Sequence, residues 1–189
     1  MRGKPTDSDI EVTRMGGNAR VRVAIISDTH GQLDPRIADA AARHDCVVHA
    51  GDVGGEGVLK ALRPKRSIVV AVRGNNDVAS KWPASERPAL DRLPSAAIFH
   101  LPGGIIAVVH GHLAGRPGTR HERLRAYFPE ARMVVFGHSH RRCVDRGARP
   151  WVVNPGAAGR ARAYGGPGLL SLTATAARWS LRSMVYDRL

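Results

Sequence analysis

The chain repeatedly follows a short apolar run with a small group of Asp, Asn, His and Gly residues. Five such runs occur between residues 21 and 140 of the 189-residue sequence. They end in Asp28-Thr29-His30, Gly51-Asp52, Gly74-Asn75-Asn76-Asp77, His110-Gly111-His112 and Gly137-His138-Ser139-His140. Short runs rich in β-branched residues and bounded by turn residues are typical of buried strands. Because ligands of α/β sheets collect beyond the carboxyl ends of the strands, we expect these five groups to converge in space.

The segments between and after these runs predict a mixed α/β domain. Asp34 followed by Pro35 is a favourable helix start, and a second short helix is expected before Pro64. Residues 96–112 are typical of a hairpin with a Pro-Gly-Gly turn, and residues 118–128 of an exposed basic helix. Parallel βαβ units combined with hairpins imply two packed sheets flanked by helices.

Two other segments are expected to lack regular structure. Residues 78–94 contain three prolines and no clear period, which predicts a loop, with or without a helical turn. Residues 1–20 are polar and aperiodic, which predicts a disordered leader ahead of a single domain over residues 21–189. Met15 is an alternative start that would remove most of this leader.

Several function classes receive no support from the sequence. No run approaches the roughly 18 apolar residues of a membrane span, and the N-terminal residues lack the apolar region of a signal peptide. Cys46 and Cys143 form neither a disulfide framework nor a CxxC zinc motif. We therefore expect a protein of a reducing, cytoplasmic environment without a membrane partner.

The charge of the chain is strongly basic and unevenly distributed. The formal net charge is +13, and residues 115–189 carry 14 arginines against 4 acidic residues. Such an excess favours a nucleic-acid partner. However, only 5% of the residues are aromatic, and no zinc-finger or stacking motif accompanies the arginines. The excess of arginine over lysine also fits a G+C-rich coding sequence, so both explanations stay open.

The residue types at the five strand ends favour a metal centre. Histidine and carboxylate groups are ligands for Mn, Fe, Co, Ni and Zn ions. Side chains two residues apart on an extended segment point the same way, so Asp28 and His30 can serve one site, as can His138 and His140. Each motif alone is more often a turn or a solvated strand end. Their joint placement at the ends of apolar strands favours the metal site.

The ordered set D-x-H, G-D, G-N-x-D, H-G-H and G-H-x-H resembles the calcineurin-like metallophosphoesterases. The short length and the Asn154-Pro155-Gly156 motif are similar to the small bacterial and archaeal phosphodiesterase branch, which shares its fold with the retromer subunit. The resemblance covers about residues 21–185. It implies a four-layer α/β/β/α sandwich with two mixed β-sheets.

The resemblance also implies a dinuclear centre and a reaction. The first ion would be held by Asp28, His30 and His140; the second by Asn75, His110 and His138; Asp52 would bridge both. The ions would be two divalent metals about 3.5–4 Å apart, Mn²⁺ first, with Fe, Ni, Co and Zn as alternatives. A hydroxide bridging them would attack phosphorus in a small phosphodiester or nucleotide-like substrate, with phosphomonoesters as a second substrate class.

Other site residues are expected around these ligands. Many relatives have a histidine after the metal-binding Asn, where it assists the leaving group, whereas this chain has Asn76. His112 is the candidate replacement, two residues beyond His110, and Asp77 is expected to orient neighbouring groups. Arg116 follows the H-G-H motif and is a candidate to bind a substrate phosphate, although a solvated basic helix is the simpler interpretation.

Two alternatives to a phosphoesterase stay open at this point. The retromer relative indicates that the fold can serve as a protein-interaction scaffold once its metal site decays, but all seven ligand positions are filled here. The basic charge favours a nucleic-acid binder or nuclease. The sequence does not determine the oligomeric state, a homo-oligomer included.

Overall fold

Two mixed β-sheets form the centre of the molecule. The computed structural model describes residues 4–15, 17, 19–159 and 162–187. The six-stranded sheet contains, in spatial order, β1 (Ile10–Arg14), β5 (Ala96–Leu101), β6 (Gly104–Val109), β7 (Met133–Val135), β9 (Trp151–Asn154) and β8 (Cys143–Asp145). The five-stranded sheet contains β11 (Trp179–Val185), β10 (Gly168–Ala174), β2 (Val21–Ile26), β3 (Cys46–His49) and β4 (Ile68–Ala71). Strand β8 was not expected from the sequence.

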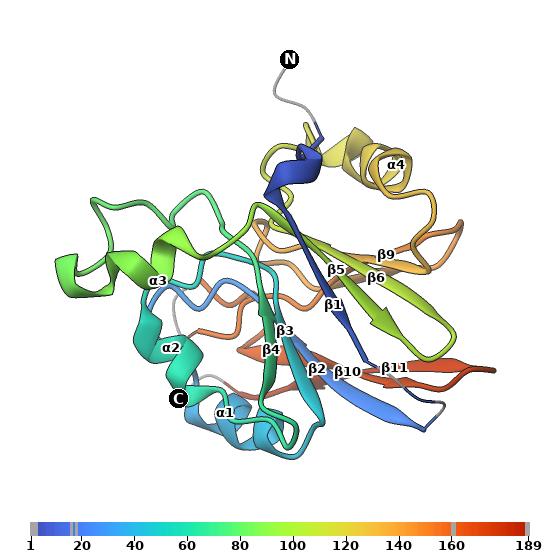
Figure 1. Cartoon of the computed structure of the whole chain (residues 1–189), viewed down its shortest axis with the longest axis horizontal. Helices are drawn as coiled ribbons and strands as arrows, with labels where there is room; N and C mark the ends of the chain where they lie inside the picture. Colours follow the sequence, from blue (N-terminus) through green and yellow to red (C-terminus); the bar gives the residue numbers. More distant parts are fainter. Residues whose placement is uncertain (1–3, 16, 18, 160–161, 188–189) are drawn as a thin grey trace.

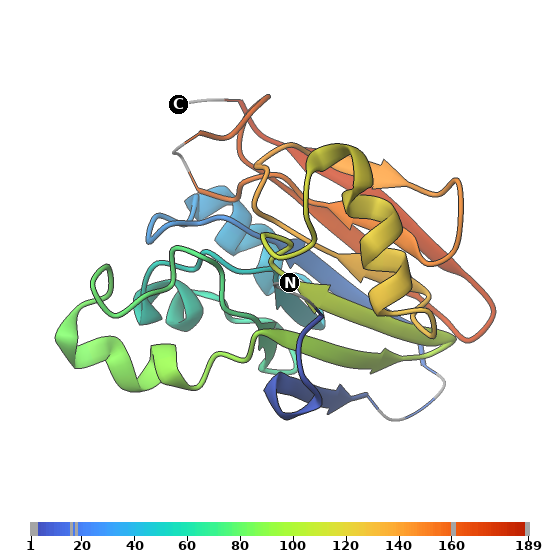
Figure 2. The same ribbon diagram turned by 90° about the horizontal axis from the view of Figure 1, so that it is seen from above.

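Helices cover the outer faces of both sheets. Three helices, α1 (Pro35–Ala42), α2 (Glu56–Ala61) and α3 (Arg87–Asp91), lie on the side of the five-stranded sheet, whereas α4 (Pro117–Tyr127) lies across the six-stranded sheet (Figures 1 and 2). The predicted four-layer α/β/β/α sandwich with two mixed sheets is therefore confirmed. None of the helices among the described residues is long and apolar enough to cross a membrane.

Successive side chains of a strand point to opposite faces of its sheet and fill the layers on both sides. In β2, Val23 and Ile25 belong to the core between the two sheets, whereas Ala24 and Ile26 pack beneath α1. All four side chains are fully buried. Burying one aliphatic side chain of this kind contributes roughly 1.5–3 kcal/mol relative to leaving it exposed. Because both faces of β2 are covered, its end is fixed in space, and Asp28 follows two residues after that end.

Local signals also set the helix beginnings as expected. The Asp34 carboxylate accepts a hydrogen bond from the backbone N–H of Arg36 at 2.9 Å and caps α1, with Pro35 in the first turn. In α4, Leu124 and Arg120 are buried, so this basic helix is anchored along one side. The predicted loop over residues 78–94 contains α3 and the 3₁₀ turn η2 (Ala84–Glu86).

The prediction of a disordered leader over residues 1–20 is wrong for its described part. After the 3₁₀ turn η1 (Asp7–Asp9), β1 pairs in parallel with β5 over five residues, from Ile10 opposite Ala96 onward. Met15 is buried against the inter-sheet core and donates its N–H to the His100 carbonyl at 3.0 Å. An edge strand is held by backbone hydrogen bonds and does not require alternating apolar side chains. Its sequence therefore gives little indication that it forms a strand. Residues 1–3, 16 and 18 lie outside the described part.

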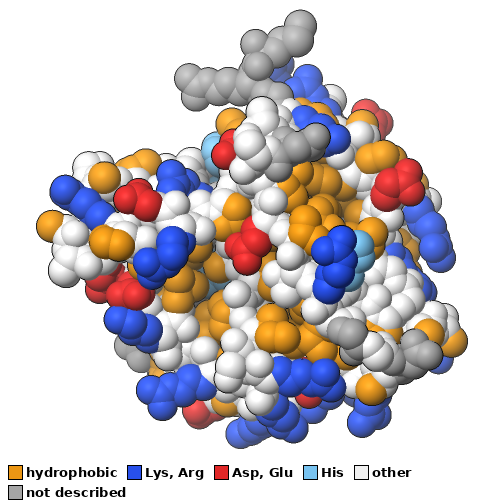
Figure 3. Space-filling model, viewed as in Figure 1, with side chains coloured by type: hydrophobic (Ala, Val, Ile, Leu, Met, Phe, Trp, Pro, Cys, Tyr) orange, Lys and Arg blue, Asp and Glu red, His pale blue; other side chains and the backbone are white. Residues whose placement is uncertain are grey.

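The basic residues do not gather into one patch on the face seen in Figure 3. Lys and Arg side chains are scattered over it, between acidic and apolar side chains. This face therefore gives no continuous basic track of the kind that a nucleic-acid backbone requires.

Candidate metal centre

The five predicted polar groups converge beyond the ends of β2, β3, β4, β6 and β7. Asp52, which follows β3, lies at the middle of the cluster. Its Oδ2 atom is 3.7 Å from His30 Nε2 on one side and 3.3 Å from His110 Nε2 on the other. One carboxylate oxygen thus lies between residues predicted to hold two different ions.

We call the first group of side chains the first half-site: Asp28, His30, Asp52 and His140. One ligand atom from each of these residues lies within 4.8 Å of the others, a spacing that allows a metal ion. His30 Nε2 is 3.1 Å from His140 Nε2, and His140 Nε2 is 3.4 Å from Asp28 Oδ1. Ring nitrogens and carboxylate oxygens therefore face one small volume.

We call the second group the second half-site: Asn75, His110 and His138, together with the shared Asp52. The Asn75 Oδ1 atom is 3.1 Å from His110 Nε2 and 2.9 Å from His138 Nδ1. The ring centroids of His110 and His138 are 5.3 Å apart. All seven residues predicted as ligands thus lie together, and the division of these ligands between two ions stays a prediction.

The backbone at these residues adopts a conformation that side chains normally avoid. Seven described non-glycine residues have a positive φ, and five of them are predicted ligands: Asp28 (54°), His30 (48°), Asp52 (54°), His138 (68°) and His140 (55°). Residues held in the left-handed region cost on the order of 1–3 kcal/mol each and cluster at functional sites. The strain is concentrated where the ligands turn towards one another.

Two glycines allow the loops to approach one another this closely. A Cβ atom on Gly74 would lie 2.1 Å from Asp52 Oδ1, and one on Gly137 would lie 2.8 Å from Asp28 Oδ2. Neither carboxylate can move away without leaving the site. These two positions therefore exclude any side chain.

Neighbouring groups orient the ligands. His110 Nδ1 is hydrogen-bonded to the Ala50 carbonyl at 2.8 Å, which places the proton on Nδ1 and leaves Nε2 free to ligate. The Asn154 amide donates to the Gly137 carbonyl at 2.7 Å and to Ser139 Oγ at 3.1 Å. The Asn154-Pro155-Gly156 motif thus fixes the turn that carries both His138 and His140.

Asp77 positions loops and does not face the ligands. Its carboxylate accepts hydrogen bonds from the N–H groups of Val53 (3.1 Å), Gly54 (2.9 Å) and Gly74 (2.8 Å). It also accepts one from the Trp82 indole at 3.1 Å. The carboxylate is buried and fully used in this network, as expected for a residue that orients its neighbours.

Asn76 is attached to the shared carboxylate. Its N–H donates to Asp52 Oδ1 at 2.8 Å, and its side-chain amide donates to Asp52 Oδ2 at 2.7 Å. The ammonium group of Lys81 donates to Asn76 Oδ1. Lys81 was missed by the sequence analysis because it lies in the irregular segment after the G-N-N-D motif, where spacing gives no signal.

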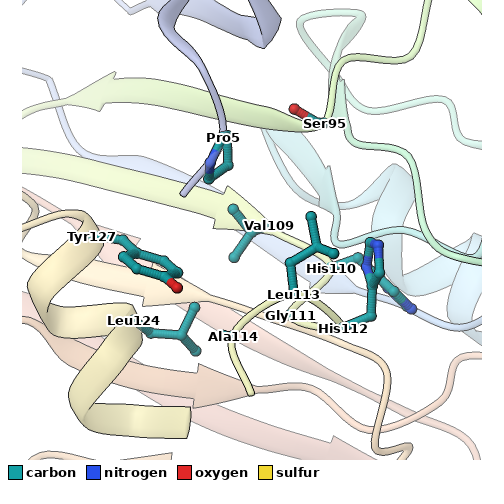
Figure 4. Close-up of a pocket in the computed structure, with 10 residues that line it drawn as sticks. All are labelled: Pro5, Ser95, Val109, His110, Gly111, His112, Leu113, Ala114, Leu124 and Tyr127. Carbon is teal, nitrogen blue, oxygen red and sulfur yellow. The ribbon is translucent and has the colours of Figure 1, made fainter. Parts of the chain in front are cut away.

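His112 lies beside the second half-site. Its ring centroid is 5.5 Å from that of His110 and 6.2 Å from that of His138. Figure 4 shows the apolar end of the same segment, where Leu124 and Tyr127 line a small pocket together with Pro5. Apolar packing under α4 therefore holds the segment that carries His112.

Arg116 is not brought to the ligands. It is the N-cap residue of α4, and its exposed side chain makes no capping hydrogen bond; no hydrogen bond or ion pair within the described residues joins it to a predicted ligand. Arg120 is buried and donates to the Gly115 carbonyl at 3.2 Å, and its charge helps to lower the pKa of His138. The predicted role of Arg116 in binding substrate stays a prediction.

Burial and charge set the protonation of the cluster. Burial raises the pKa of Asp28 to about 6. Burial would also raise the pKa of Asp52, but the hydrogen bonds and charge of His110, with two bonds from Asn76, lower it below its usual range. Burial lowers the pKa of His140 to about 4, helped by His30, and it lowers the pKa of His30 as well.

His110 differs from the other three histidines. Burial would lower its pKa, but the hydrogen bond to Asp52 and the negative charges of Asp28 and Asp52 raise it. The pKa of His138 is lowered, chiefly by burial and then by the charge of His110. The cluster thus contains two carboxylates, three histidines whose pKa is lowered, and His110, whose pKa is raised.

This donor set fits divalent ions. Neutral imidazoles, carboxylates and an amide oxygen are ligands of transition-metal dications, and no thiolate is present in the cluster. The Nε2 atoms of His30 and His140 face each other at 3.1 Å, and the two carboxylates are buried close together. A bound cation would relieve both conditions.

Comparison with known proteins agrees with this geometry. A protein of Methanothermobacter thermautotrophicus named as a probable metallophosphoesterase is 24% identical over 139 residues, which cover 71% of this chain and 75% of that protein. A single-residue variant of Vps29 from Entamoeba histolytica superposes with a TM-score of 0.66 at 19% identity, covering 88% of this chain and 99% of that one. An archaeal phosphodiesterase superposes with a TM-score of 0.64 at 20% identity, covering 87% and 99%.

The structural similarities establish the fold, and the sequence establishes the family. Residues 21–176 match the sequence profile described as the calcineurin-like phosphoesterase superfamily domain. The match includes every residue of both half-sites. The chain therefore belongs to the calcineurin-like phosphoesterase superfamily.

Proposed function

We propose that the protein is a hydrolase that cleaves phosphodiester bonds with two divalent ions, Mn²⁺ first among the candidates. The observation that carries the proposal is the position of Asp52 Oδ2 between His30 Nε2 at 3.7 Å and His110 Nε2 at 3.3 Å. A carboxylate placed in this way can serve two ions at once. Phosphomonoesters are the second substrate class.

Each group of residues has a part in this proposal. Ions held by the two half-sites would polarise a phosphoryl oxygen and lower the pKa of a water molecule between them. Asp28 and Asp52 supply the negative charge that holds dications, and His30, His138 and His140 offer neutral nitrogens because burial lowers their pKa. The strained backbone keeps these groups oriented before substrate binds.

The negative charge that develops on the leaving oxygen has to be stabilised by another group. Asn76 has no proton to transfer near neutral pH, but it accepts a hydrogen bond from the Lys81 ammonium. Lys81 can turn from Asn76 to donate to the departing oxygen as the ester bond breaks. His112, beside His110 and His138, is the alternative for this role.

The two other functions receive less support. A scaffold would not need two half-sites filled with competent ligands or a backbone strained at five of them. A nucleic-acid binder would favour a continuous basic surface, whereas the basic side chains on the face in Figure 3 are scattered. The similarity to Vps29 still makes a protein partner compatible with the fold.

The test is hydrolysis of bis(p-nitrophenyl) phosphate by protein stripped of metal and then supplied with Mn²⁺. We expect turnover that depends on the added ion and stops with a chelator. Asn75→Ala should abolish most of it, whereas Asp39→Ala, an exposed change on α1, should not. Full Mn²⁺-dependent turnover by Asn75→Ala, or none by the unchanged protein, would reject the proposal.

A further inference from the structure

A groove runs away from the second half-site along the segment that follows Asn75. Its lining includes Asn75 and His112 beside the metal centre and the apolar residues Val78, Ala79, Leu90 and Leu113, and it is completed by Arg73, Gly74, Asp77 and Asp91. Its walls thus come from the segment between β4 and α3, from α3 itself and from the turn after His112. The groove is continuous with the candidate metal centre because it shares Asn75 with it.

The apolar wall is exposed at its rim. Val78 is one of five large hydrophobic side chains among the described residues that are clearly exposed, at 40% of its surface. Leu90, by contrast, is buried in the cluster beneath the same segment. An apolar side chain that lines a groove beside a polar centre is a typical contact for a ligand.

The rim is held in an ordered turn. Val78 donates its N–H to the Asn76 carbonyl at 3.0 Å, and Lys81 donates its N–H to the Val78 carbonyl at 2.9 Å. Trp82 anchors the turn, buried and bonded to Asp77 at 3.1 Å. Val78 is therefore positioned before any ligand arrives.

The charges of the groove do not favour a second anionic group. Arg73 donates through Nη2 to the Leu90 carbonyl at 2.7 Å, which turns its guanidinium towards the backbone. Asp91 contributes an opposite charge to the lining, and the Asp77 carboxylate is occupied by backbone and indole donors. The lining has two carboxylates against one guanidinium, whose Nε atom is buried without a hydrogen-bond partner among the described residues, so an additional phosphate would meet more negative than positive charge.

We propose that this groove binds the uncharged, apolar or aromatic ester group of a phosphodiester whose phosphorus lies at the metal centre. The inference rests on the proposed function and adds the class of substrate to it. Val78 and Leu113 contact the ester group, and Asn75 marks the point where the group joins the phosphate. Nucleoside polyphosphates are poor substrates on this account, because their further phosphates would enter the groove.

The test compares two diesters with the same leaving group, phenyl p-nitrophenyl phosphate and methyl p-nitrophenyl phosphate, with Mn²⁺-loaded protein. We expect kcat/KM to favour the phenyl diester by at least about 10-fold, since small apolar contacts discriminate by roughly 10–200-fold. Val78→Ser should remove most of this preference through KM. The matched control is Val144→Ser, which changes a valine of similar exposure (41%) in β8.

Equilibrium binding separates this inference from the proposed function. Diphenyl and dimethyl phosphate are titrated into the same Mn²⁺-loaded proteins, and neither needs to be hydrolysed. Tighter binding of diphenyl phosphate that Val78→Ser abolishes and Val144→Ser keeps supports the groove, even if no diester turns over. Equal binding of the two diesters, or a preference that Val78→Ser leaves intact, overturns it.

Discussion

The two half-sites of the metal centre differ in burial and in charge. The first contains two buried carboxylates, Asp28 and Asp52, with two histidines whose pKa is lowered. The second has an amide, Asn75, whose side chain is exposed, and shares only Asp52. A dication gains more from two carboxylates than from one shared carboxylate. We therefore infer that the first half-site binds its ion more tightly than the second.

The difference also assigns different tasks to the two halves. The first half-site is enclosed, and burial raises the pKa of Asp28, so a bound cation would offset the buried charge of this carboxylate. The second opens onto the groove through Asn75 and lies beside His112, where a substrate can enter. This asymmetry predicts that the first half-site holds its ion tightly and that the second holds a more accessible ion next to the substrate.

Removing one histidine from each half gives the largest contrast. His140→Ala should weaken the tighter ion by at least about 100-fold, because a direct ligand contributes more than the 10–100-fold of an orienting neighbour. His138→Ala should leave that ion in place and weaken the second by a similar factor. Mn²⁺ titrations of both variants measure this. Equal loss of both ions in each variant would remove the distinction between the halves.

Asp28→Asn should weaken metal binding and increase the stability of the metal-free protein. Because burial raises the pKa of Asp28 to about 6 from 3.8, its charge opposes folding at pH 8 and not below about pH 4. Each pKa unit corresponds to about 1.4 kcal/mol, so the metal-free variant should gain about 2–3 kcal/mol at pH 8. Urea unfolding at pH 8 and pH 4 measures it, with Asp39→Asn as the surface control. A destabilised metal-free variant at pH 8 would contradict this.

The pH dependence of metal binding should separate the halves as well. Protons compete for Asp28, whose pKa is raised to about 6, so affinity at the first half-site should fall by about tenfold per pH unit below pH 6. The pKa of His110 is raised above the ordinary 6.5, so affinity at the second should begin to fall at a higher pH. Mn²⁺ titrations from pH 5 to 8 test this order. Coincident curves would argue against it.

Lys81 should have the smallest effect, and one that depends on the substrate. Lys81→Met should lower kcat by about 10-fold for diesters with alkyl leaving groups and little for p-nitrophenolate, which needs little stabilisation. Lys81→Arg should restore most of the loss, because it keeps the charge. Lys60→Met, on the exposed side of α2, is the control. If His112→Ala gives this pattern and Lys81→Met does not, the role belongs to His112.

The sequence predicted which polar residues converge better than it predicted the edges of the fold. The ligands follow buried strands, and such strands leave a clear apolar signal, so Asp52 and His138 could be placed from their neighbours. Strand β1 has no such signal because it is held by the backbone of β5. Lys81 reaches Asn76 only through the turn anchored by Trp82, and that contact depends on tertiary packing. The spacing of residues along the chain therefore cannot predict this contact.

A titration of metal-free protein with Mn²⁺, followed in the same samples by calorimetry and by hydrolysis of bis(p-nitrophenyl) phosphate, tests the central claim most directly. We predict two binding events of unequal affinity, with hydrolysis rising with the second, and with both events weakened in Asp52→Asn. A protein that binds no Mn²⁺, or that hydrolyses the diester equally well before any ion is added, would contradict the account.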